Sequence, residues 1–373
     1  MRLQRVVSFL GSGLLFLASG CGHEDGPALT LDLNRLDSMQ SNDDVVNGLT
    51  LNGLTLNGLT LNGLTLNGLT LNGLTLNSSS TTAPLLASVN DRLVDLGKVS
   101  FSHITLGNQT LEDAAIDGAT LVARAEDRTY RGSDLVGARL SGTLLNGTSV
   151  PLRIDDVKTD ADGTVLYSVA VLSDNGPMSL CGTANGVPVP AVVVSGYWDK
   201  AASYVDEDDS FTFGCVNAAI GKCVRWGYKP WTTAQECRNN SCKTRKLSDW
   251  HRACVRLVRA DYCGDGVSHT RNGTIINVYD QIGIQKSSNP GWEVEAEWGA
   301  DGASCIRHTR WLQANTIYGE TDLAYIQRVC PSRLAANNGP RCAVDKTTYN
   351  TQFGFNRSSD ERPLVRNESP EYQ

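Results

Sequence analysis

The chain has 373 residues, of which 40% are hydrophobic, and its 40 acidic residues outnumber 33 basic ones, which gives a formal net charge of −7 at pH 7. Proteins that bind nucleic acid carry a basic surface, so this acid excess argues against that class of function. The length is sufficient for one large domain or two modest ones.

The N-terminus predicts export. A positively charged start precedes an apolar core at residues 6–17, and Leu-Ala-Ser-Gly-Cys at residues 17–21 resembles the cleavage sequence of bacterial lipoproteins. The core is shorter than the about 20 residues of a membrane-spanning helix, which makes that alternative weaker. We expect residues 1–20 to be a signal peptide and Cys21 to carry lipid that anchors the chain to a membrane. Gly22, where an aspartate would signal inner-membrane retention, favours the outer membrane or cell surface.

A tether at residues 21–46 leads to six uninterrupted copies of Asn-Gly-Leu-Thr-Leu in residues 47–77, and residues 78–84 form a linker. A period of five fits neither the two-residue period of a strand nor the helical period of about 3.6. Turns at each Asn-Gly would keep the leucines on one side, as in a pentapeptide-repeat solenoid, which the tract resembles. Six copies are few for such a stack, although leucines at the same period in residues 132–147 could extend it. A short solenoid and a flexible stalk both remain open.

Eleven cysteines are present, and ten remain if Cys21 is lipidated. All ten lie in the C-terminal half, which in an exported protein is typical of disulfide bonds. Zinc is disfavoured, because there is no Cys-x-x-Cys and no histidine pair at ligand spacing. We expect no metal site and up to five disulfides, whose pairing the sequence leaves open. The cysteines concerned are Cys181, Cys215, Cys223, Cys237, Cys242, Cys254, Cys263, Cys305, Cys330 and Cys342.

A β-rich body is expected to follow Leu85, and residues 85–130 are its connecting region. Asn-Gly at 146–147 and Asp-Gly at 162–163 stand between apolar runs and predict tight hairpin turns, and residues 192–194 predict an apolar strand. Three aspartates between residues 156 and 162 are spaced somewhat like a calcium-binding loop but lack an acid that such a loop requires, so we interpret them as turn residues.

Residues 247–264 predict a helix, with Ser248 as N-cap and Gly264 as its stop. Its three arginines, at positions 252, 256 and 259, share one face. That face could bind an anionic partner, but a solvated face paired with nearby acids is the favoured interpretation.

Farther along, residues 292–298 alternate between apolar residues and glutamates, which predicts a strand with one wet face. Residues 323–330 predict a short helix that ends before a proline. Residues 346–373 are polar, and we expect them to form a mobile tail.

The tetrapeptide Ala260-Asp261-Tyr262-Cys263, followed by Gly-Asp-Gly, resembles the ADYC domain, which is named for it. The resemblance continues upstream at residues 223–231 and downstream at 302–310, and we place the domain at residues 131–345. It implies an exported bacterial protein, and the family has no assigned activity.

The candidate catalytic residues in and after this motif are Asp261, Asp265 and His269. They could act as an acid–base set in hydrolysis of a glycan or ester. No G-x-S-x-G elbow, H-E-x-x-H, phosphate loop or dinucleotide fingerprint accompanies them. The favoured alternative is that Asp261 caps or pairs within the fold, the tyrosine packs, and Cys263 forms half of a disulfide.

The sequence therefore predicts a surface-tethered lipoprotein. Its body is expected to be an α+β, β-rich, disulfide-stapled globular domain behind a short pentapeptide-repeat solenoid or flexible repeat stalk. A non-enzymatic binding or structural role at the cell envelope is the leading hypothesis, with an unknown surface ligand or envelope partner and no cofactor. A hydrolase that uses Asp261 or Asp265 with a histidine is the alternative.

Overall fold

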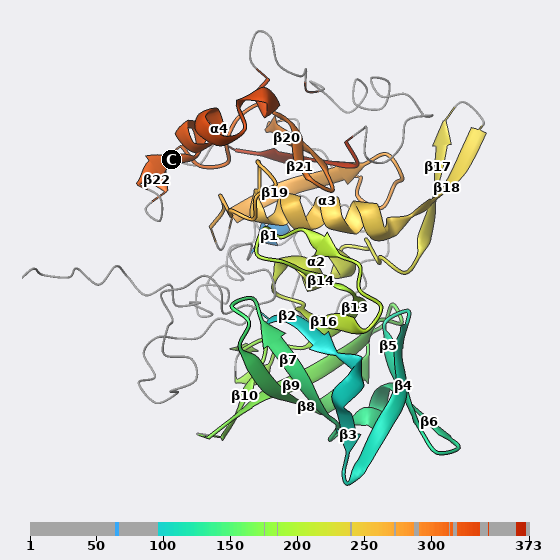
Figure 1. Ribbon diagram of the computed structural model, residues 1–373. Helices are drawn as coiled ribbons and strands as arrows, with labels where there is room; N and C mark the ends of the chain where they lie inside the picture. The colour runs from blue at the N-terminus through green and yellow to red at the C-terminus, as the bar shows by residue number, and fades with distance from the viewer. Residues whose placement is uncertain are drawn as a thin grey trace, which may run out of the picture.

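The computed structural model describes residues 64–66, 96–174, 176–184, 186–238, 241–271, 274–286, 291–312, 314–315, 319–335, 342 and 363–370. The expected signal peptide, Cys21, the tether, the linker and all of the repeat tract except residues 64–66 lie outside them. A β-barrel lies at one end of the molecule, and helices α2 (Ala219–Arg225) and α3 (Leu247–Arg259) lie between it and a second sheet (Figure 1). None of the described helices is long and apolar enough to cross a membrane.

Six antiparallel strands close into the barrel. Around the ring the order is β9, β13, β16, β2, β7 and β8, and β8 pairs with β9 to close it. Closure leaves no open edge within the ring. The strands are β2 (Leu96–Ser100), β7 (Arg139–Leu144), β8 (Ser149–Thr159), β9 (Val165–Ser173), β13 (Ala191–Ser195) and β16 (Ser210–Cys215).

Both hairpin turns predicted from the sequence are confirmed. Gly147 turns the chain between β7 and β8 at φ 88°, and Gly163 turns it between β8 and β9 at φ 79°, a backbone region that favours glycine. Alternate residues of β8, namely Val150, Leu152 and Ile154, are buried in the barrel core, as the two-residue period of a strand requires.

Residues 96–131, most of which lie in the expected connecting region, form five strands of the barrel sheet. β3 pairs with β7 and β4, and β4, β5 and β6 continue as a meander. Residues 132–147, whose leucines could have extended a solenoid, form η4 (Gly132–Leu135), β7 and a hairpin turn. Leu135 and Leu140 belong to the barrel core. The added strands are β3 (Ile104–Leu106), β4 (Gln109–Asp117), β5 (Thr120–Ala125), β6 (Arg128–Arg131) and β10 (Gly176–Ser179), which pairs with β9.

Several short ribbons and 3-10 helices lie around the barrel sheet and the second sheet. Two-stranded ribbons are β11 (Thr183–Ala184) with β12 (Val187–Pro188), β14 (Tyr197–Trp198) with β15 (Tyr204–Val205), β17 (Thr233–Arg238) with β18 (Ser241–Lys246), and β22 (Ala314–Asn315) with β23 (Glu320–Thr321). The 3-10 helices are η3 (Phe101–His103), η4 (Gly132–Leu135) and η5 (Pro331–Arg333).

The second sheet has five antiparallel strands in the order β1, β19, β24, β20, β21. β1 comes from the repeat tract and pairs with β19, with Leu64 opposite Ile276. The short helix expected near residues 323–330 is confirmed as α4. The elements are β1 (Leu64–Leu66), β19 (Thr274–Asp280), β20 (Glu293–Gly299), β21 (Gly302–Ile306), β24 (Val365–Ser369) and α4 (Asp322–Val329).

Strand β13 joins the two hydrophobic cores. Val193 packs in the barrel core, whereas Val192 and Val194 on its other face belong to the core around α2, α3 and the second sheet. A strand buried on both faces is a continuous apolar run, which explains the Ala-Val-Val-Val sequence of this strand.

Three expectations about polar residues are wrong. Helix α3 is capped by Lys246 rather than Ser248 and ends at Arg259, and its arginines at 256 and 259 are buried because the helix lies between two layers. Two of the three glutamates of β20, Glu295 and Glu297, are also almost fully enclosed rather than wet, and Glu293 at the start of the strand is exposed.

Residues 363–370 do not form a mobile tail, because β24 lies in the middle of the second sheet. Its polar side chains are buried. The indole N–H of Trp298 donates to Asn367 Oδ1 at 2.7 Å, and the Arg366 guanidinium lies 3.6 Å from the Glu368 carboxylate. Buried polar groups that find partners cost little, so a polar sequence can still be an interior strand.

All ten expected cysteines form disulfides, as predicted. The pairs are Cys181–Cys215, Cys223–Cys254, Cys237–Cys242, Cys263–Cys330 and Cys305–Cys342. The first lies in the barrel, the second links α2 to α3, and the fourth links the loop after α3 to the end of α4.

Removal of these bridges is expected to have unequal effects. Cys263 and Cys330 are 67 residues apart, whereas Cys237 and Cys242 are 5 apart. Loop-closure entropy then predicts a loss of about 4 kcal/mol for replacing the first pair by alanine and about 2 kcal/mol for the second. Urea unfolding of the two double variants measures the difference, and equal losses would contradict this ranking.

Candidate functional site

Helix α3 ends at the Ala260-Asp261-Tyr262-Cys263 motif. Ala260 adopts a left-handed conformation at φ 51° and ψ 41°, its N–H bonds to the carbonyl of Leu257, and the N–H of Asp261 bonds to the carbonyl of Arg256. These two bonds are those of a Schellman C-cap, which satisfies carbonyls at a helix end. The motif therefore begins as a helix terminator.

The Asp261 carboxylate is fully buried and accepts hydrogen bonds from a side chain and from the backbone. It pairs with the guanidinium of Arg256 and accepts the backbone N–H groups of Asp265 and Gly266, each at 3.1 Å. Burial raises the pKa of Asp261, and the nearby Arg256 guanidinium opposes that rise. Since these donors are internal and the residue has no exposed surface, the carboxylate holds the loop after α3 in shape.

Arg256 connects that loop to its surroundings. Its guanidinium donates to the carbonyl of Ala201 at 2.6 Å, in the β14–β15 connection, and to that of Ala300 at 3.3 Å, in the turn between β20 and β21. The ion pair with Asp261 thus joins the helix end to two other segments.

The Tyr262 side chain leads to a second buried ion pair. Its hydroxyl donates to Glu295 Oε1 at 3.1 Å and accepts the backbone N–H of Arg310 at 2.8 Å, and its ring stacks on Trp298. Arg310 binds Glu295 through two bonds of 2.9 and 2.8 Å and also donates to the carbonyl of Leu257 at 3.1 Å. Although burial opposes it, Arg310 lowers the pKa of Glu295.

Glycines allow the loop to pass close to its neighbours. Gly264 has a φ of 72°, and a Cβ there would lie 1.9 Å from the carbonyl oxygen of Asp301. Gly266 has a φ of 83°, and a Cβ there would lie 2.6 Å from the carbonyl oxygen of Lys200. Both positions require glycine for conformation and for space.

The side chains of Asp265 and His269, two members of the proposed acid–base set, are each bound by another residue. Asp265 accepts the Tyr325 hydroxyl at 2.6 Å and the N–H of Val267 at 3.0 Å. His269 is buried and pairs through Nδ1 with Asp322 Oδ1 at 2.9 Å. The carboxylate beside the imidazole is therefore that of Asp322, at the start of α4, a residue the sequence analysis did not single out.

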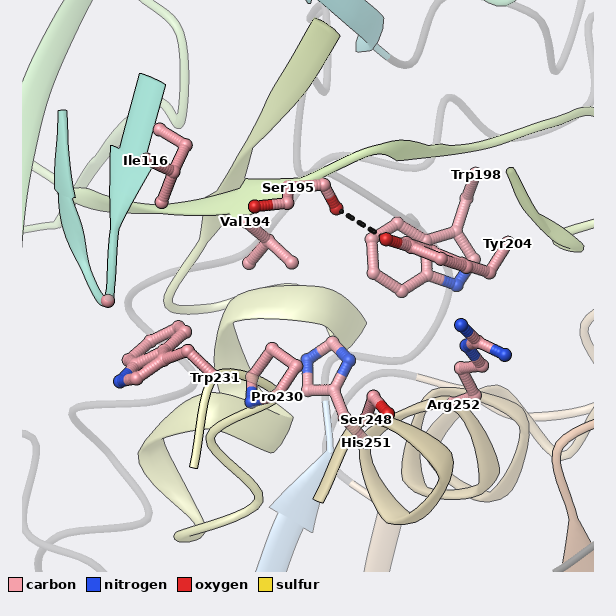
Figure 2. Close-up of a pocket in the computed structure, with 11 residues that line it drawn as sticks. Ile116, Val194, Ser195, Trp198, Tyr204, Pro230, Trp231, Ser248, His251 and Arg252 are labelled. Atoms are coloured by element: carbon pink, nitrogen blue, oxygen red, sulfur yellow. Dashed lines mark hydrogen bonds between the residues drawn. The ribbon is translucent and has the colours of Figure 1, made fainter. Parts of the chain in front are cut away.

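A pocket of about 120 Å³ opens at the other end of α3 (Figure 2). The helix contributes Ser248, His251 and Arg252, and the loop after α2 contributes Trp231. The facing wall comes from the β4–β5 hairpin, strand β13 of the barrel and the β14–β15 ribbon, with Ile116, Gly118, Val194, Ser195, Trp198 and Tyr204. Residues from four separate segments thus surround one opening between the two cores.

Two side chains from α3 set the polarity of this pocket. Nε2 of His251 lies 3.0 Å from the carbonyl of Ile220, and burial lowers the pKa of His251 to about 4, so its imidazole is neutral at pH 7. The guanidinium of Arg252 lies over the ring of Tyr204, 4.1 Å from its centre, and 3.8 Å from the Asp249 carboxylate. The Tyr204 hydroxyl in turn donates to the carbonyl of Ser195 at 3.0 Å.

Among the described residues, no group of three or more His, Cys, Asp or Glu side chains is arranged to hold a metal ion.

Comparison with known proteins matches the part of the chain that holds both the motif and most of the pocket. Residues 132–312 match the ADYC domain. No curated protein and no solved structure matches the chain. The ADYC match starts at η4 and ends two residues after Arg310, so it spans both buried ion pairs but not β2–β6 or α4.

Within the ADYC region, the four motif residues have distinct structural tasks. Ala260 ends the helix, Asp261 fixes the following loop, Tyr262 reaches the Arg310–Glu295 pair, and Cys263 bonds to Cys330. The interpretation of the motif as a structural element agrees with each of these contacts.

The pH dependence of stability is expected to report on His251. Its pKa is about 4 in the fold, below the ordinary value near 6.5, so the unfolded chain binds a proton that the folded chain does not. The contribution of His251 to the free energy of unfolding is complete above about pH 6.5 and is lost as the pH falls towards 4. In that range the free energy of unfolding changes by up to about 1.4 kcal/mol per pH unit. Urea unfolding between pH 7 and 4 should show a shallower slope for His251→Gln, and an unchanged slope would contradict the assignment.

Proposed function

We propose that this protein is a non-enzymatic binding module that a lipid on Cys21 holds at the outer membrane or cell surface. In this proposal the ADYC motif organises the domain, and the pocket beside Trp231 and His251 takes a ligand of the cell envelope. The repeat tract acts as a stalk or short solenoid between the lipid and the body.

The observation that carries this proposal is the division of tasks along helix α3. Asp261, at one end, is buried against Arg256 and backbone N–H groups. The pocket, at the other end, is lined by aromatic, hydroxyl and neutral imidazole groups. Arg252 and Asp261 are separated by nine residues, about 14 Å along a helix axis, so the motif carboxylate is remote from the pocket.

The composition of the pocket supports binding. Ligand sites are concave, with apolar and aromatic walls and a few polar groups that orient the ligand. Trp198, Tyr204 and Trp231 supply the aromatic walls, and Ser195 and Ser248 supply hydroxyls. The hydrolase alternative uses Asp261 or Asp265, and neither of these residues lines the pocket.

The hydrolase alternative rests on one observation, the pairing of His269 with Asp322 at 2.9 Å. Such a pair resembles the base and orienting acid of many hydrolases. Both side chains are buried, at 2% exposure or less for each residue, and Tyr325 packs against the imidazole. We therefore assign the pair to the anchoring of α4 on the loop after the motif.

A retention assay tests the binding function. The full chain carrying Cys21→Ser, so that no lipid on residue 21 holds it to membranes in this or later retention measurements, is incubated with a cell-envelope preparation. The preparation is pelleted and examined for bound protein and for released reducing ends or carboxylates. We expect retention without products, and an about tenfold weaker retention for Trp231→Ala. Trp292→Ala, a half-buried tryptophan outside the pocket, is the matched control and should bind normally. Product release that disappears in Asp322→Asn would support the hydrolase instead.

A fractionation experiment tests the anchor separately. The wild-type chain is expected to remain with membranes and to incorporate labelled palmitate, whereas Cys21→Ser should be soluble and unlabelled. Membrane association that survives this substitution would exclude lipid on Cys21 as the anchor.

A further inference from the structure

We propose that the pocket between α3 and the barrel binds a single neutral sugar ring, such as a terminal unit of an envelope glycan. This inference rests on the proposed binding function and names the class of ligand for the same pocket.

The size of the pocket limits the occupant to one ring. Its volume is about 120 Å³, and a protein cavity of about 150 Å³ is known to hold one benzene molecule. The opening is also partly exposed, because Trp231, Arg252 and Tyr204 are only half-buried. One face of a ring can therefore be enclosed while its other atoms and the rest of a longer chain remain in solvent.

The walls of the pocket suit the faces of such a ring. Figure 2 shows Trp231 beside Pro230 at one end, Trp198 and Tyr204 at the other, and Ile116 and Val194 on the barrel side. Aromatic faces carry partial negative charge, and the axial C–H groups of a pyranose are weakly positive. Stacking of a sugar face on a partly exposed indole is therefore favourable, and Trp231 can provide such an indole.

The polar groups suit hydroxyls rather than a charged group. The Ile220 carbonyl can only accept a hydrogen bond, so Nε2 of His251 carries the proton and Nδ1 of the neutral ring is an acceptor. Ser195 and Ser248 can both donate and accept, and Arg252 donates. Sugar hydroxyls act as donors and acceptors at once and can use this mixture.

The charge balance of the pocket disfavours ions. A cationic ligand would meet the guanidinium of Arg252. An anionic ligand would have to compete for that guanidinium with Asp249, which lies 3.8 Å away, and the imidazole of His251 adds no positive charge at pH 7. A neutral polar ring avoids both costs.

Saturation-transfer NMR on the full exported protein tests this assignment. The probes are glucose, galactose and N-acetylglucosamine, with benzoate as a ring of similar size that carries a carboxylate. We expect transfer to the ring protons of at least one sugar, with a dissociation constant on the order of 1 mM, and little transfer to benzoate. Trp231→Ala should weaken sugar binding at least tenfold, and Trp292→Ala should leave it unchanged.

A second variant tests the same pocket in case Trp231→Ala does not fold. Ile116→Trp fills the pocket from the barrel wall, opposite Trp231, and is expected to abolish transfer with normal circular dichroism. Transfer to benzoate alone would overturn the sugar assignment while envelope retention, and with it the proposed function, still stood. Sugar binding that survives both Trp231→Ala and Ile116→Trp would show that the sugar binds outside this pocket, and would overturn the inference. No transfer to any of the sugars would overturn the inference, whereas envelope hydrolysis would overturn the binding function itself.

Discussion

Replacement of Arg310 by methionine is expected to lower the free energy of unfolding by about 3–5 kcal/mol. The guanidinium and the Glu295 carboxylate are both completely buried, at 0% side-chain exposure. Methionine fills the volume but leaves that carboxylate without its counter-ion. The change also removes donors to Thr270 and to the carbonyl of Leu257 at the end of α3. Urea unfolding of the disulfide-bonded protein, followed by tryptophan fluorescence, measures the loss.

The neighbouring pair of Arg307 and Glu293 supplies a matched control. Its side chains are 37% and 70% exposed and lie 3.7 Å apart, and exposed ion pairs contribute at most about 1 kcal/mol. Arg307→Met should therefore change the free energy of unfolding by less than that. Similar losses in the two variants would mean that the Arg310–Glu295 pair is not enclosed as described.

Replacement of Asp261 by asparagine is expected to cost about 3–5 kcal/mol. An amide cannot balance the buried charge of Arg256, and its NH₂ group would point a donor at the guanidinium or at the N–H groups of Asp265 and Gly266. Asp265→Asn is the control in the same loop. It is half-buried, and we expect it to cost about 1–2 kcal/mol. If the two variants were equally stable, the buried ion pair would not be the feature that holds the loop.

Local patterns of the sequence predict much of this fold. The Asn-Gly and Asp-Gly turns stand where the barrel hairpins need positive φ, at Gly147 and Gly163. The even number of cysteines beyond Cys21 predicts complete pairing. The helix before the motif follows from its apolar period. Each of these signals depends only on residues close together in the chain.

Features that depend on distant partners escape prediction. The polar segment at residues 365–369 is an interior strand because groups such as the Trp298 indole meet its side chains. Glu295 and Arg256 look like surface charges until Arg310 and Asp261 are placed beside them. Sequence alone cannot reveal these pairs, because their members are brought together only by the fold.

The candidate site was unpredictable for the same reason. The sequence directs attention to the motif acids, whereas the pocket assembles Ile116, Trp198, Trp231 and His251 from separate segments. A local signal did exist, since Ser248, His251 and Arg252 share one face of the predicted helix. Their significance appears only when the barrel wall is placed opposite them.

The central claim is that the motif holds the fold while the pocket binds. The most direct test measures both stability and envelope retention for Asp261→Asn and Trp231→Ala, at a temperature where both variants are folded. We predict that Asp261→Asn loses about 3–5 kcal/mol of stability and keeps its retention. Trp231→Ala should keep most of its stability and lose about tenfold in retention. Normal stability with lost retention in Asp261→Asn would contradict this account and would place the motif carboxylate in the functional site.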